Sequence, residues 1–105
     1  MQLSVMERFV IQGLLPQRAS MTDLLIAKNI REAVGFTEDE LVALEIKEDG
    51  GRVEWNPEAA AAIVKDVEFS GPQTALLVAA LDKLDKDNEL QIEHLSLCEK
   101  FGIGA

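Results

Sequence analysis

The chain contains little cysteine and histidine, and it has no tyrosine. Its 105 residues include one cysteine (Cys98), one histidine (His94) and one tryptophan (Trp55). A lone cysteine excludes a disulfide within the monomer and favours a reducing environment. One histidine and one cysteine also supply too few soft ligands for a structural zinc site. We therefore expect neither a metal centre nor a cofactor.

Long apolar runs and phosphate-binding loops are missing as well. The longest apolar stretch, Ala75–Leu81, is far shorter than the ~20 residues of a membrane span. Residues 1–8 lack the basic segment and the following apolar run of a signal peptide. No glycine-rich loop follows a predicted strand, and no basic patch is interleaved with aromatic residues. These absences predict a cytoplasmic protein that contacts neither a membrane nor nucleic acid.

Negative charge is present in excess. The chain has 19 acidic and 10 basic side chains, a net charge of −9. Residues 37–68 alone hold ten acids against three bases, a net of −7. A field of this sign repels phosphate backbones and anionic lipids and attracts basic partners. The length and composition fit one globular domain over residues 1–105.

Helix starts are marked three times by a hydroxyl residue with an acid three positions later, the pattern of a capping box. The pairs are Ser4 with Glu7, Ser20 with Asp23, and Thr37 with Glu40. The pattern predicts helices over 5–14, 21–34 and 38–43, and two more are expected over 71–86 and 91–101. The first carries an apolar stripe of Met6, Phe9, Val10, Gly13 and Leu14. Gly35 is expected in the left-handed conformation that ends many helices.

Two strands and a tight turn are predicted between the third and fourth helices. Residues 44–55 alternate apolar and polar side chains around Asp49-Gly50, a type I′ turn signal, which indicates a β-hairpin. Residues 64–69 are expected to add a third strand beside the hairpin. The expected fold class is therefore α+β, with about five helices packed on a small antiparallel sheet.

Catalytic and metal-binding patterns are weak. The stretch Asp85–Glu89 begins like a calcium loop, but Leu90 and Ser96 stand where that loop needs glycine and glutamate. A solvated turn is the better interpretation. His94 and Cys98 lie one helical turn apart and could form a nucleophile pair, but such neighbours seldom present an oriented base. A surface histidine and a half-buried structural cysteine are expected instead, and no catalytic residue is assigned.

Partner contacts are expected at the tryptophan and at the last helix. Trp55 at the end of the hairpin is predicted to be a core anchor or an interface hot spot. In the last helix Leu97 and Phe101 share one side, Ile92 and Leu95 share another, and Ile103 follows. One side must find a partner or stay exposed. We assign Leu97, Phe101 and Ile103 to a homodimer or partner contact.

Several segments together resemble a set of short phage and prophage proteins of unassigned function. They are Leu3 with Glu7-Arg8, Leu14–Pro16, Phe36–Glu40, Val53 with Trp55-Asn56, and His94–Phe101. The resemblance covers nearly the whole chain, but its motifs are caps, a turn and helix faces, so it transfers no catalytic or binding residue. It implies a structural, assembly or host-interaction role.

The functional expectation is a non-enzymatic protein that works by binding another protein or a second copy of itself. The first alternative is an acidic mimic of nucleic acid, which would need the charges between Glu38 and Glu68 to form one continuous surface. The second is a small enzyme using His94 and Cys98.

Overall fold

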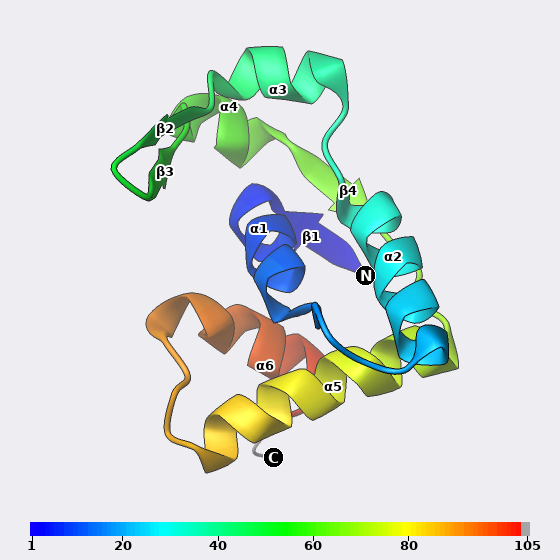
Figure 1. Ribbon diagram of the computed structural model, residues 1–105. Helices are drawn as coiled ribbons and strands as arrows, with labels where there is room; N and C mark the ends of the chain where they lie inside the picture. The colour runs from blue at the N-terminus through cyan, green and yellow to red at the C-terminus, as the bar shows by residue number, and fades with distance from the viewer. Residues whose placement is uncertain (104–105) are drawn as a thin grey trace.

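The computed structural model describes residues 1–103, except for the side chains of Asp49 and Val53. The elements follow in the order β1 (Gln2–Ser4), α1 (Val5–Leu14), α2 (Met21–Val34), α3 (Glu38–Leu44), β2 (Lys47–Asp49), β3 (Arg52–Glu54), α4 (Pro57–Ala62), β4 (Val64–Asp66), α5 (Gly71–Lys86), the 3-10 turn η1 (Ile92–His94) and α6 (Leu95–Phe101). The expected α+β class is confirmed. In Figure 1, α3, the hairpin and α4 form one end of the molecule, while α2, α5 and α6 form the other around α1.

The strands form two separate two-stranded sheets rather than one sheet of three strands. β2 pairs with β3 as the predicted hairpin, but β4 pairs antiparallel with β1, with Leu3 opposite Lys65. The predicted placement of residues 64–69 beside the hairpin is therefore wrong. The strand at 2–4 has only three residues, too few to show an alternating pattern. The pairing encloses apolar side chains, since Leu3 is fully buried and Val67 nearly so.

The hairpin turn lies one residue later than predicted. Gly50 and Gly51 are its two central residues, with φ of 58° and 83°. A type I′ turn needs positive φ at both central positions, and glycine adopts it without a Cβ clash. Asp49 instead ends β2.

The core lies between α1, α2, α5, α6 and the β1–β4 pair. Its buried members are Leu3, Ile11, Leu15, Ala27, Ile30, Val34, Val67, Leu77, Leu81, Leu97 and Cys98. Helix α5 contributes only Leu77 and Leu81 as fully buried residues, spaced one turn apart. Because Ala75 and Ala79 on its other face are exposed, α5 is a one-sided core helix.

The predicted helix caps are present, and two of them also hold distant elements. Ser4 with Glu7 and Thr37 with Glu40 form complete capping boxes, whereas the Ser20 side chain caps α2 without a return bond from the shorter Asp23. Glu7 also binds Lys100 of α6 at 2.7 Å, and Glu40 binds Arg8 of α1 at 2.7 Å. The same carboxylates therefore fix local helix starts and long-range packing.

Arg8 takes the place of the expected glycine cap at the end of α2. Gly35 has φ −62° and ψ 157°, an extended rather than left-handed conformation, so that prediction was wrong. The Arg8 side chain is fully buried and donates to the carbonyls of Val34 and Gly35. These carbonyls lie at the end of α2, where the backbone carbonyls have no hydrogen-bond donor within the helix. The guanidinium thus ties α1 to the junction of α2 and α3 and fixes which face of α1 stays open.

Candidate functional site: an apolar groove along α1

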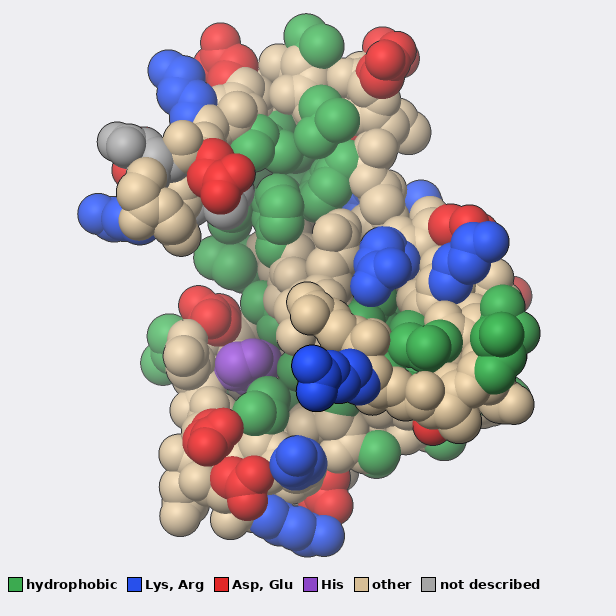
Figure 2. All heavy atoms as spheres, viewed as in Figure 1, with side chains coloured by type: hydrophobic (Ala, Val, Ile, Leu, Met, Phe, Trp, Pro, Cys, Tyr) green, Lys and Arg blue, Asp and Glu red, His purple; other side chains and the backbone are tan. Residues whose placement is uncertain are grey.

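An open groove of about 940 Å³ runs along the face of α1 opposite its buried side. Its floor consists of residues on the apolar stripe of α1: Met6, Phe9, Val10, Gly13 and Leu14. The fully buried residues of the helix lie on another face: Val5, Glu7, Arg8 and Ile11. The stripe is thus only partly covered, and Met6 is 42% exposed. Figure 2 shows the hollow on this face, with apolar side chains along it and the histidine at its rim.

One end of the groove is aromatic. Trp55 stacks on Phe9 with ring centroids 5.0 Å apart and planes 12° apart, and Phe9 in turn contacts Phe36 at 4.8 Å. The Arg8 guanidinium lies 4.0 Å above the Phe36 ring, a cation–π contact. The amide of Asn56 donates to the Leu44 carbonyl at 2.7 Å and holds the base of the hairpin. Trp55 is therefore held in place while one side remains open to the groove.

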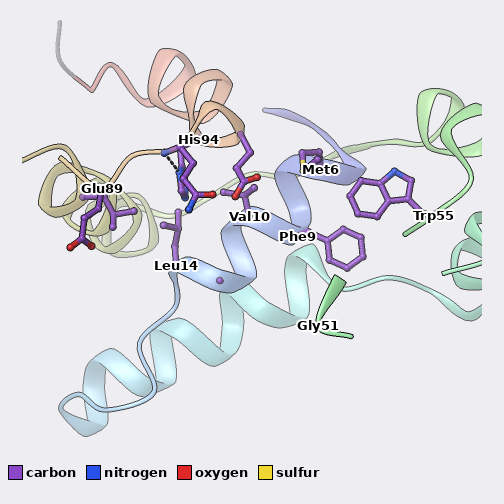
Figure 3. A pocket seen from close by; sticks show the side chains of 12 residues that line it. Met6, Phe9, Val10, Leu14, Gly51, Trp55, Glu89 and His94 are labelled. Carbon is purple, nitrogen blue, oxygen red and sulfur yellow. Dashed lines mark hydrogen bonds between the residues drawn. The ribbon is translucent and has the colours of Figure 1, made fainter. Parts of the chain in front are cut away.

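The other end of the groove is acidic. Glu89 from the turn after α5 and Glu93 from η1 are exposed there, with the half-buried His94. His94 Nδ1 accepts a hydrogen bond from the Gln91 amide at 2.9 Å, drawn in Figure 3. Figure 3 also places Trp55 near the Met6 end of α1, and Glu89 and His94 near the Leu14 end. No lysine or arginine is among the described residues that line the groove.

Negative charge at this end has a second source. Helix α1 has no basic residue in its last turn, so nothing on the helix itself compensates the partial negative charge of its C-terminal carbonyls. These carbonyls lie next to Gly13 and Leu14, two residues that line the groove. The groove therefore changes from aromatic to electronegative along its length.

The structure places the four predicted contact residues apart. Trp55 lines the groove, but Leu97 is fully buried in the core, so its assignment to a partner contact was wrong. Phe101 and Ile103 pack against the same core, and Phe101 contacts Phe69 at 6.2 Å. The exposed side of this region carries Ile92 and Leu95 instead, at 88% and 55% exposure. The side that was not assigned to a partner contact is thus the exposed one.

The end of α6 explains this orientation. Gly102 adopts the left-handed conformation at φ 72°, and the Ile103 amide donates to the Cys98 carbonyl at 2.8 Å. This is the bond pattern of a Schellman ending, which folds the next apolar residue back onto the helix. The chain therefore packs against the core as far as Ile103.

Cys98 and His94 do not combine into an activated nucleophile. The Cys98 side chain is 7% exposed, and burial, with a smaller contribution from the charge of Asp85, raises the pKa of its thiol. A raised pKa leaves less thiolate, the reactive form. The Nδ1 atom of His94 is already occupied by the Gln91 amide. Burial therefore keeps the thiol protonated, and one imidazole nitrogen is engaged by the backbone.

The other predicted features occupy the surface. Asp85 and Lys86 end α5, and Asp87–Glu89 form the turn that follows. Among the side chains that the structure describes, no three acidic, histidine or cysteine groups gather as a metal site would require, and none of the described helices combines the length and apolarity of a membrane span. The acidic residues between positions 37 and 68 are spread over α3, the hairpin, α4 and β4, and one of them, Glu40, forms an ion pair with Arg8.

Comparison with known proteins provides no assignment: neither a protein-family model, nor a curated protein, nor a solved structure matches the chain.

Proposed function

We propose that this protein acts by binding another protein through the α1 groove and that it does not catalyse a reaction. The observation that carries the proposal is the open apolar floor of the groove, which ends at a stacked Phe9–Trp55 pair. Tryptophan is among the residues most enriched at binding hot spots, because a large flat ring buries much area at little entropic cost. Methionine, here Met6, adapts its shape to a partner.

The apolar stripe is the strongest argument for a partner. A helix in a monomer usually turns its apolar stripe toward the core. Here the buried face of α1 holds two charged residues, Glu7 and Arg8, beside the apolar Val5 and Ile11, while the apolar stripe lines the groove. A contiguous apolar surface left open to water marks a binding site more often than it is tolerated without use.

The enzymatic alternative receives little support from the site. The nucleophile considered from the sequence, Cys98, is buried with a raised thiol pKa, and it lies in the core rather than in the groove. The mimicry alternative would rest on the acids of α3, the hairpin and α4. It predicts binding that weakens steeply with salt, whereas an apolar groove responds less.

The biological role and the cellular location that we propose are inferred from the sequence. The resemblance to short phage and prophage proteins supports an assembly or host-interaction role. The single cysteine supports a reducing, cytoplasmic location.

A pair of substitutions at Gly13 tests the proposal. A Cβ at this position would meet no atom within 4 Å, so a larger side chain can enter the groove without disturbing the core. Tagged wild type, Gly13→Ala and Gly13→Phe are used to capture proteins from lysate of the cells that make the chain. We expect the wild type and Gly13→Ala to retain a protein that Gly13→Phe loses. Equal capture by all three, or no capture, contradicts the proposal.

A further inference from the structure

The two ends of the groove differ in chemistry, and the proposed function does not depend on this difference. Its aromatic end is formed by Met6, Phe9 and Trp55, and its acidic end by Glu89 and Glu93. Figure 3 shows Trp55 near the Met6 end of the helical floor and Glu89 near its Leu14 end. An occupant that satisfies both must carry apolar side chains along one face and positive charge toward one end.

Gly13 indicates how close the occupant approaches. It is the penultimate residue of α1, still helical, where glycine is less favourable than alanine, and none of the described atoms lies within 4 Å of the place its Cβ would take. Glycine at such a position allows another backbone to come near. The separation of two packed helices is set by the side chains between them, so a glycine in the floor allows the shortest separation.

From these observations we infer that the groove receives a basic amphipathic helix of another protein. Its apolar face packs on Met6, Val10 and Trp55, its backbone passes over Gly13, and its lysine or arginine side chains meet Glu89 and Glu93. The uncompensated C-terminal end of α1 adds to the attraction at that end. The inference rests on the proposed function and adds the chemistry of the partner to it.

Trp55 provides a direct measurement, because it is the only tryptophan and lines the groove. The probe is a helical peptide of about 18 residues, long enough to fold, made of leucine and lysine at amphipathic spacing and lacking aromatic residues. A matched peptide carries glutamate in place of lysine. We expect the leucine–lysine peptide to shift Trp55 emission to shorter wavelength and to bind at least about tenfold more tightly than the leucine–glutamate peptide.

Two control pairs separate groove binding from general attraction to an acidic chain. Neutralising the acidic end with Glu89→Gln and Glu93→Gln should lower the affinity for the leucine–lysine peptide about three- to tenfold. Neutralising Glu38 and Asp39 of α3, outside the groove, with Glu38→Gln and Asp39→Asn should leave its affinity nearly unchanged. Gly13→Phe should abolish the response, while Gly13→Ala, which adds only one methyl group, should weaken it far less, with helical content checked by circular dichroism.

Several results would overturn the inference: no Trp55 response, equal affinity for the two peptides, equal losses from the two neutralised pairs, or full binding by Gly13→Phe. Its failure is separable from that of the proposed function. A captured protein that depends on Gly13 but is not displaced by the leucine–lysine peptide leaves the function standing and removes the basic helix as its partner.

Discussion

Arg8 and Glu40, thirty-two positions apart, form a two-pronged ion pair that joins α1 to the start of α3. Arg8 Nη1 donates to Glu40 Oε2 at 2.7 Å, and Nη2 donates to Oε1 at 3.1 Å. The arginine is fully buried, while the Glu40 side chain remains 20% exposed. Arg8 also bonds the end of α2 and covers Phe36, which contacts the Phe9 ring of the groove. The pair thus supports the aromatic end of the site.

Removing the arginine should destabilise the fold strongly. Arg8→Ala removes the donor to the Val34 and Gly35 carbonyls and leaves Glu40 with only the Thr37 amide, so we expect the free energy of unfolding to fall by about 3–5 kcal/mol. Arg8→Lys keeps the charge but loses the planar fork, so it should be destabilised by less. Urea unfolding followed by circular dichroism measures both. An Arg8→Ala protein as stable as the wild type would contradict the role of this contact.

Stability should fall in acid through Glu40. The hydrogen bonds from Arg8 lower the pKa of Glu40 from 4.5 to about 2, although partial burial opposes the shift. A carboxyl with a depressed folded-state pKa contributes stability that is complete above its unfolded pKa and is lost as the pH falls toward the folded value. The contribution, about 3 kcal/mol, should therefore disappear between about pH 4.5 and pH 2. Urea midpoints of Glu40→Gln across this range should depend less on pH than those of the wild type.

Lys100 should matter more than the exposure of its side chain suggests. Burial raises the pKa of Glu7. Hydrogen bonds, of which that from Lys100 is the largest, lower the pKa by more than burial raises it, so the net pKa lies below its ordinary value. Lys100→Met would leave this carboxylate buried without a counter-charge, at a cost of about 1–3 kcal/mol. Glu7→Gln combined with Lys100→Met should recover part of the loss, because glutamine keeps the capping box without a charge. Thermal and urea unfolding of both variants test the difference, and equal stabilities would argue against it.

Gly13→Ala should stabilise the free protein. Alanine is favoured over glycine inside a helix by about 0.5–1 kcal/mol, and the new methyl group meets no atom within 4 Å. Gly35→Ala is the matched control: its Cβ would lie 3.2 Å from the Arg31 carbonyl oxygen, so no gain is expected there. Differential scanning calorimetry compares the two. A destabilised Gly13→Ala would show that the position is more crowded than the structure indicates.

Local features of this fold could be predicted from sequence, and long-range ones could not. The caps at Ser4 and Thr37 join residues three positions apart, so their signature lies in one short segment. The β1–β4 pairing joins Leu3 to Lys65, and the Arg8 contacts reach Val34 and Glu40. No short window of sequence contains both partners of such contacts.

The site itself was half visible in the sequence. Trp55 stood out as the only tryptophan, and the stripe from Met6 to Leu14 was recognised as apolar. The face of α1 that is buried contains Arg8 and Glu7. Charged residues normally mark the solvent-facing side of a helix, so the sequence pattern pointed to the wrong face. The missed signal is Gly13, a glycine within an otherwise apolar helical stripe, which should have suggested a close contact rather than core packing.

Photo-crosslinking from the groove tests the central claim most directly. A benzophenone amino acid is placed at Met6, 42% exposed in the floor of the groove, or at Leu25, 53% exposed on α2 and outside the groove. After irradiation in the cells that make the protein, crosslinked peptides are identified by mass spectrometry. We expect position 6 to crosslink a basic helical segment of another protein and position 25 to give no such product. Crosslinks from position 25 alone, or none from position 6, would contradict the account.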